Sequence, residues 1–438
     1  MRRNVYPLNE VFMNDPFAIK AFDFPDGFVW GASTAGHQIE GDNIHCDRYA
    51  EEIERAKTEP HFEVSGKACN SYSMWRDDIN ILSELHCKMY RMSLEWSRIQ
   101  PQEGVFVESE LKHYIEIFEA LKARGIKLCL TLIHFTVPQW FGKKGGLANA
   151  ENLPYFERYL EYVVPKVAPY VDMWCVLNEI NLNGADFKFN AFKFHARGYH
   201  IIKKYSDKPV SSAHALVMQS ACRRGDRFDE ALVAYDDALK NEFFFHAVRT
   251  GELVVLGKDG EYNKEFKNTC DYWAVNTYIR DIIDARRANG YLSGGRYSFD
   301  RLDMLPRDFY LNGMDAECVV HNVMRLTDKP IFITENGCSC DDDDFRKVFI
   351  VEYLAALAQC VGMGADVKGY LYWSLMDNYE WGSYMPKFGL VSVDRDKDFA
   401  RTVKQSGYLF RDIIDNNGYK PEFLQKCLKA LPRVKYGI

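Results

Sequence analysis

The sequence lacks the features that mark nucleic-acid-binding and membrane proteins. Lys and Arg total 55 against 62 Asp and Glu, the net charge is −7, and there is no basic stripe, so nothing favours nucleic acid as a partner. Arg2 and Arg3 are not followed by an apolar stretch, which argues against a secretion signal and a membrane anchor. We therefore expect a cytoplasmic protein with no nucleic-acid or membrane partner.

The chain also lacks a C-x-x-C pair, although it has 12 cysteines. Most of them, such as Cys129 and Cys175, lie inside apolar runs, which predicts buried free thiols. Cys338-Ser-Cys340 and the four aspartates of residues 341–344 come nearest to a metal site, but their spacing fits no zinc pattern. We expect a solvated loop there, and neither a metal nor a cofactor.

No stretch rich in Pro, Gly and Ser divides the chain, and no low-complexity segment interrupts it. Apolar residues make up 47% of the sequence and aromatic residues 14%, enough for a large core with rings left over for a pocket. We predict a single domain over residues 1–438. A homo-oligomer is compatible with this sequence.

Short apolar runs alternate with stretches of helical spacing, a pattern that predicts parallel strands with helical crossovers. No G-x-G-x-x-G string follows the first run, which disfavours a doubly wound dinucleotide-binding sheet. We predict an α/β fold of the closed (β/α)8 type, the TIM barrel. The eight expected strands are residues 28–34, 88–96, 127–135, 173–180, 231–235, 272–279, 329–337 and 367–375.

Helical spacing is clearest over residues 111–125, where Leu111, Ile115 and Phe118 share one face and Gly125 supplies the stop. Residues 345–364 behave in the same way before the last strand. Three longer segments follow the first, fourth and sixth strands, and we predict that they are inserted loops that wall a pocket on the carboxyl-terminal face. These segments are residues 41–70, 181–195 and 281–310.

Two of the expected strands end in a glutamate beside an asparagine: Glu179 in VLNEI and Glu335 in FITENG. Glycosidic bond cleavage requires an acid to protonate the leaving oxygen and an anion on the other face of the sugar. The carboxyl ends of barrel strands converge on one mouth, so this pair predicts a glycosidase.

The other strand ends carry amides, a histidine, carboxylates and large aromatic rings. Sugar hydroxyls need both donors and acceptors, and the C–H face of a pyranose packs on an aromatic plane. A sugar-binding pocket is therefore predicted. Its candidate residues are Gln38, Arg91, His134, Phe135, Asn178, Asn276, Tyr278, Trp373, Glu380 and Trp381.

With these motifs the chain resembles glycoside hydrolase family 1, the family of retaining β-glucosidases and β-galactosidases. The resemblance covers nearly the whole chain. It is carried, in order, by FVWGASTAGHQIEG, YRMSLEWSRI, LNE, ITENG, WSLMDNYEWGSYMPKFGL and KQSGYLFRDIIDNNG.

The resemblance implies that Glu335 is the nucleophile and Glu179 the acid/base. Arg91 and Tyr278 would then support the ionised nucleophile, while a neighbouring anion and a partly dry pocket would raise the pKa of Glu179. Asn178 is expected at the sugar 2-hydroxyl, with Trp373 as the platform beneath the ring. Gln38, His134, Glu380 and Trp381 are expected at the other hydroxyls.

The resemblance also bears on the substrate. The carboxylate of Glu380 would repel a phosphate, which favours an unphosphorylated sugar. Phe135 replaces a more usual indole near the 3-hydroxyl, so the choice among glucose, galactose, fucose and mannose stays open. The leading hypothesis is an exo-acting retaining β-glycosidase; a transglycosidase using the same intermediate and a catalytically silent sugar-binding barrel are the alternatives.

Overall fold

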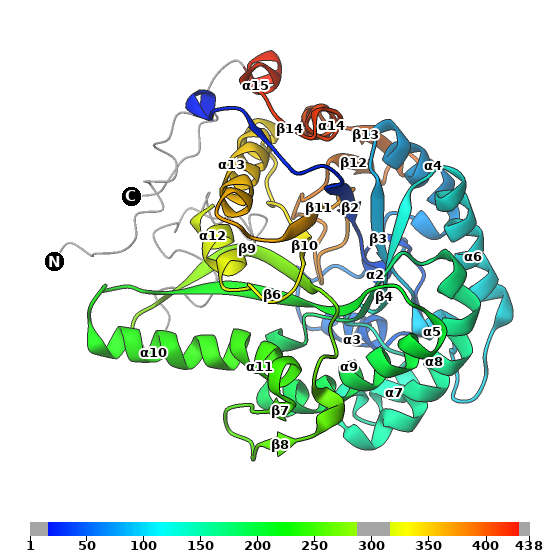
Figure 1. Cartoon of the computed structure of the whole chain (residues 1–438). Coiled ribbons are helices and arrows are strands. Elements are labelled where there is room, and N and C mark those ends of the chain that lie inside the picture. Colours follow the sequence, from blue (N-terminus) through cyan, green and yellow to red (C-terminus); the bar gives the residue numbers. More distant parts are fainter. Residues whose placement is uncertain (1–15, 287–315, 429–438) are drawn as a thin grey trace.

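The protein forms a closed barrel of parallel strands in a computed structural model that describes residues 16–286 and 316–428 (Figure 1). Neighbours around the barrel follow the order β10, β11, β2, β3, β4, β5, β6 and β9. The predicted TIM barrel is thereby confirmed. The strands are β2 Val29–Ser33, β3 Met89–Ser93, β4 Lys127–Ile133, β5 Met173–Asn178, β6 Val210–Ala221, β9 Trp273–Ile283, β10 Ile331–Asn336 and β11 Val367–Trp373.

Helices connect successive strands and cover the outside of the barrel (Figure 1). A large apolar core lies between the strands and these helices, and a smaller cluster of strand residues, including Met89, Cys129 and Leu371, fills the barrel interior. The main helices are α4 Ser71–Glu84, α6 Glu108–Ala123, α8 Leu153–Val167, α9 Ala185–Tyr205, α10 Arg227–Asp237, α11 Phe243–Thr250, α12 Glu317–Met324, α13 Asp343–Gly362 and α14 Gln405–Asn416.

The predicted fifth strand is wrong. Residues 231–235 lie in α10, where the carboxylate of Asp226 caps the helix by accepting from the backbone N–H groups of Phe228 and Asp229. The fifth strand is β6, whose buried polar side chains interrupt the apolar run by which a buried strand is predicted. The side chain of Ser212, for example, accepts from Leu177 N at 3.1 Å, so it is buried without loss of hydrogen bonding.

Strands β6 and β9 also run well beyond the barrel. They stay paired as far as Ala221 opposite Ile283, and Figure 1 shows them as a long ribbon that projects from the barrel beside α10.

The inserted segments differ from the expectation. Residues 41–70 do follow the first strand and contain the helix α3 Asp47–Arg55. Residues 181–195 are wrongly predicted as a loop, because most of them form the first half of α9. Of residues 281–310, the first three continue β9, and residues 287–310 lie outside the described residues.

The cysteines are free thiols, all buried except the half-buried Cys427. The expected solvated loop holds for Asp341 and Asp342, which are exposed, but not for Asp343 and Asp344, which form the first turn of α13; Asp342 caps this helix by accepting from Asp344 N at 2.9 Å. Within the ranges the structure describes, no group of three or more His, Cys, Asp or Glu side chains is placed to hold a metal ion. In the same ranges, no helix is both long and apolar enough to cross a membrane.

Candidate active site

A cavity of about 300 Å³ opens among the carboxyl-terminal ends of the barrel strands. The predicted site residues lie in the barrel strands or shortly after them in the sequence. All of them except Arg91 and Asn178 line this one cavity. The predicted lining residues are Gln38, His134, Phe135, Glu179, Asn276, Tyr278, Glu335, Trp373, Glu380 and Trp381.

Glu335, in β10, is held on both carboxylate oxygens. Oε1 forms a short ion pair with the guanidinium of Arg91, and Oε2 accepts from the Tyr278 hydroxyl at 2.7 Å. Burial raises the pKa of Glu335 above its ordinary value, while Arg91 and Tyr278 act in the opposite direction. The two predicted supporting residues therefore do contact Glu335 and favour its anion, although burial is the larger effect.

Arg91 lies behind the cavity rather than on its surface. It is fully buried in β3, where Nη2 donates to Asn178 Oδ1 at 2.7 Å and Nε donates to Thr131 Oγ1 at 3.1 Å. One guanidinium thus fixes a carboxylate on β10 and an amide on β5 at the same time. The place of Arg91 within β3 buries its side chain beneath the cavity surface, which is why Arg91 does not line the cavity.

Glu179 directly follows β5, and the neutral side-chain amide of Asn276 donates to it. The amide Nδ2 of Asn276 donates to Glu179 Oε1 at 2.8 Å. Thr334, the neighbour of Glu335 in β10, donates to Asn276 Oδ1 at 2.7 Å and so orients that amide toward Glu179. The two carboxyls on the cavity consequently have different electrostatic surroundings.

Three buried polar atoms of the cavity have no hydrogen-bond partner within the described residues. They are Gln38 Oε1, His134 Nδ1 and Glu380 Oε1. Because buried polar atoms are nearly always hydrogen-bonded, this end of the cavity is suited to a ligand with several hydroxyl groups. The set contains acceptors and a ring nitrogen that can donate, which matches a sugar.

The protonation states at this end follow from burial. Burial and the charge of Arg91 keep the pKa of His134 well below its usual value, so the ring is neutral, and its Nε2 lies 3.2 Å from the amide Nδ2 of Asn178. Burial raises the pKa of Glu380 to about 8. Glu380 is therefore a carboxyl group that changes charge just above neutral pH.

Aromatic rings form the remaining walls. Trp373, at the end of β11, stacks on His134 with ring centroids 5.8 Å apart and planes 13° apart. Phe135 and Trp381 meet edge to face at 5.2 Å. Both Phe135 and Trp381 have left-handed backbones, with φ of 67° and 47°, a conformation that costs a non-glycine residue about 1–2 kcal/mol. Surrounding contacts must offset that cost.

The sequence did not identify several other lining residues. Leu216 and Val217 come from β6, the strand that was misplaced, and Phe345 and Phe349 are four residues apart on α13. This i, i+4 spacing can be read from the sequence, but any helix that faces the core has it, so it does not indicate a cavity. The remaining residues of this group are Arg48, Leu182, Asn183, Ala215, Gly337, Cys338 and Phe388.

A TIM barrel whose mouth holds two buried carboxyls among amides, a histidine and stacked rings is the framework of a glycosidase. The chain belongs to glycosyl hydrolase family 1, whose family model matches residues 20–231 and 185–419. The predicted family is confirmed, and the protein is a glycosidase.

Similar proteins cover almost the whole chain. β-Glucosidase A of Thermotoga maritima is 27% identical over 90% of this chain and 98% of its own length. The 6-phospho-β-glucosidase GmuD of Bacillus subtilis is 28% identical over 91% of this chain and 99% of its own. The solved β-glycosidase of Pyrococcus horikoshii has a TM-score of 0.77 and 28% identity, over 95% of this chain and 99% of that one.

Proposed function

We propose that the protein removes a terminal, unphosphorylated β-linked sugar from glycosides, with retention of configuration at the anomeric carbon. Glu335 is the nucleophile and Glu179 the acid/base. The observation that carries this proposal is the unequal environment of two carboxyls on one cavity: Glu335 is paired with Arg91, whereas Glu179 accepts from the neutral amide of Asn276. An arginine strongly stabilises the anion that must attack, whereas a neutral amide stabilises a carboxylate less than a cation would, so we assign the proton to Glu179.

The reaction then proceeds by two displacements. In the first, Glu335 bonds to the anomeric carbon while the bond to the leaving oxygen breaks and the proton of Glu179 moves to that oxygen. In the second, Glu179 takes a proton from water, whose oxygen attacks the anomeric carbon and releases Glu335. Asn178, expected at the sugar 2-hydroxyl, lies behind the cavity surface, where its Oδ1 accepts from Arg91 and Asn276.

The sugar-binding end of the cavity supports an exo-acting enzyme. Gln38, Glu380 and Trp381 form this end, and each is buried or packed against buried side chains. A terminal β-glucosyl unit, or a β-galactosyl or β-fucosyl unit, fits this arrangement better than the middle of a chain.

The carboxyl of Glu380 also argues against a phosphorylated sugar. A phosphate beside it would meet a negative charge once this carboxyl ionises, at and above about pH 8. Because GmuD is a 6-phospho-β-glucosidase, this point has to be measured. Nitrophenyl β-glucoside, β-galactoside, β-fucoside, β-mannoside and β-glucoside 6-phosphate should be compared, and preference for the phosphorylated substrate would overturn this part of the proposal.

The catalytic roles are tested with two variants. Glu335→Gly should lose turnover and recover it with added azide, which would yield the glycosyl azide of inverted configuration. Glu179→Ala should keep activity only toward aryl glycosides whose leaving groups need no proton. If both variants still hydrolysed an alkyl glycoside, neither role could stand.

A further inference from the structure

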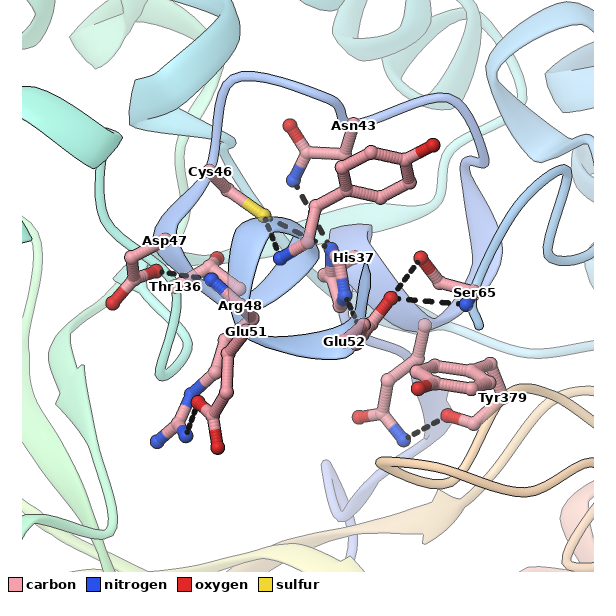
Figure 2. A network of polar contacts seen from close by, with 12 residues as sticks. His37, Asn43, Cys46, Asp47, Arg48, Glu51, Glu52, Ser65, Thr136 and Tyr379 are labelled. Atoms are coloured by element: carbon pink, nitrogen blue, oxygen red, sulfur yellow. Dashed lines mark hydrogen bonds and ion pairs between the residues drawn. The ribbon is translucent and has the colours of Figure 1, made fainter. Parts of the chain in front are cut away.

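A buried polar network is centred on His37 (Figure 2), whose ring stacks on Trp381. His37 is 1% exposed and does not line the cavity. Its Nε2 lies 2.7 Å from Glu52 Oε1, and its Nδ1 lies 3.4 Å from Cys46 Sγ and 3.3 Å from Asn43 Nδ2. Both ring nitrogens are therefore engaged, and the ring cannot rotate without breaking these contacts.

The charges within the network fit an ion pair between His37 and Glu52. Burial lowers the pKa of His37, but Cys46 and Glu52 raise it, and the net pKa is well above the usual value. Burial raises the pKa of Glu52, but His37 and Ser65 lower it to below the usual value. The raised pKa of His37 and the lowered pKa of Glu52 agree, because each side chain favours the charged form of the other.

The His37 ring is the support on which Trp381 rests. The two rings stack with centroids 5.7 Å apart and planes 17° apart. Trp381 also meets Phe135 in an edge-to-face contact. Since Trp381 adopts a left-handed backbone that its own residue type disfavours, its position depends on such contacts.

Glu52 connects this support to the segment inserted after the first strand. Glu52 lies in α3, and its Oε2 accepts from Ser65 N at 3.0 Å and from Ser65 Oγ at 2.7 Å. The neighbouring Glu63 accepts from Tyr384 N at 2.6 Å, and its backbone N–H donates to Gly382 O at 2.8 Å. These hydrogen bonds hold the inserted segment against the loop that carries Glu380 and Trp381.

Glu95, which follows β3, connects His37 to the segment after β4 that carries Phe135. Its Oε1 accepts from the backbone N–H of His37 at 2.9 Å. Its Oε2 accepts from Asn43 Nδ2 at 2.7 Å and from Thr136 Oγ1 at 2.8 Å. Thr136 is the residue after Phe135, so one buried carboxyl links the segment that carries Phe135 to His37, on which Trp381 stacks.

We propose that His37 is a positioning residue: it fixes the place of Trp381 at the sugar-binding end of the cavity, and so sets how tightly the terminal sugar binds, without touching the sugar. This inference depends on the proposed function for the identity of the ligand. It assigns the affinity for the sugar, rather than the proton transfer and nucleophilic attack, to the network of His37, Glu52 and Glu95.

The test compares His37→Gln, which removes the ring, with His37→Phe, which keeps a ring that can stack on Trp381. For His37→Gln we expect KM for the best nitrophenyl glycoside, and Ki for the free sugar, to rise about tenfold, equivalent to about 1.4 kcal/mol, with kcat nearly unchanged. His37→Phe should raise Ki less than His37→Gln, because the stacked contact survives. Thermal melting of each variant establishes that it is folded.

The matched control is His195→Gln. His195 is also fully buried, with its Nδ1 2.7 Å from Ser212 Oγ, but it lies away from the cavity. This variant should lower the melting temperature and leave Ki unchanged. Equal rises in Ki for the His195 and His37 variants would overturn the inference, because a general loss of packing would then explain both.

A milder variant keeps the test decisive if His37→Gln fails to fold. Thr136→Val keeps the shape of the side chain but removes the donor to Glu95, and should raise KM and Ki together by about threefold. Unchanged Ki in folded variants, or a fall in kcat alone, would contradict the inference. Failure of the proposed function would look different, because the unaltered protein would then hydrolyse none of the glycosides.

Discussion

The two ends of the cavity are built in different ways. At the reacting end, Arg91, Asn276 and Glu335 stand on barrel strands, and the pairing of neighbouring strands fixes their separation. At the sugar-binding end, Phe135 and Trp381 stand on segments beyond the strands, in left-handed conformations. Strand register is sufficient to place the first group, whereas the second needs a separate network of buried polar contacts. In the proposed function the sheet therefore holds most of the reacting groups, apart from Glu179, which follows β5 with φ of 48°, and a supported loop serves recognition.

The largest expected effect comes from removing the charge that links the strands at the reacting end. Arg91→Met should lower kcat/KM by about 10²–10³-fold, since it removes a group that stabilises the reacting anion. The loss should fall mainly on kcat, measured by steady-state kinetics with an aryl glycoside. Arg91→Lys is the control for charge, and it should recover only part of the activity because lysine cannot contact Glu335, Asn178 and Thr131 together. A change confined to KM would erase the distinction between the two ends.

An intermediate effect is expected at the other end. Trp381→Ala should lower kcat/KM by about 10–100-fold, mostly through KM, because a ring that contacts the sugar and Phe135 is lost. Trp140→Ala, at a half-buried tryptophan that does not line the cavity, is the control and should leave KM unchanged. If the Trp381 variant lost kcat instead, the loop would contribute to the chemistry and the comparison would need revision.

A smaller, pH-dependent effect should also belong to the sugar-binding end. Burial raises the pKa of Glu380 to about 8, so the carboxyl is mostly neutral at pH 7 and becomes an anion as the pH rises through 8. Hydroxyl donors bind an anion more strongly than a neutral carboxyl, and Ki for the free sugar should therefore fall by about threefold between pH 7 and pH 9. Glu380→Gln should abolish this change. A pH-independent Ki in the unaltered protein would contradict the expectation.

The smallest effect on catalysis, but a measurable one on stability, is expected behind the reacting end. Helix α13 packs there, with the Tyr353 hydroxyl donating to Tyr278 O at 3.0 Å, and burial raises the pKa of the adjacent Glu352 to about 8. Its proton is held in the folded state but lost from the unfolded chain above about pH 4.5. Stability should therefore fall as the pH rises from about 4.5 to about 8, by at most about 4–5 kcal/mol.

Urea unfolding at pH 5 and at pH 8 measures this loss. Glu352→Gln should reduce the difference between the two pH values while leaving kcat/KM intact. Glu116→Gln, at an exposed position of α6, serves as the control. The same pH dependence in the Glu352 variant as in the unaltered protein would assign the loss to other groups.

The sequence was sufficient for the barrel and for the location of the candidate site because both depend on strand ends. Motifs such as FITENG combine a buried apolar run with a polar end, and a closed barrel brings such ends together. Strand β6 escaped prediction because Ser211, Ser212 and His214 are buried within it. Ser212 and His214 find hydrogen-bond partners on other elements, at Leu177, His195 and Lys240, which local sequence patterns do not register.

The support of the sugar-binding end could not be predicted for a related reason. Nothing in the residue types of Phe135 and Trp381 indicates a left-handed backbone, since glycine or asparagine is usual there. The contacts that offset the strain join His37, Glu52 and Glu95 from three separate segments. Such contacts exist only after the fold has formed.

The position of Arg91 and Asn178 behind the cavity surface has a consequence for how such an enzyme can change over time. The residues that meet a substrate and the residue that balances the charge of Glu335 are different sets. Substitutions on the lining can alter which sugar is accepted while that balance stays intact. A barrel arranged in this way is open to the divergence of new specificities from a chemistry that is inherited unchanged.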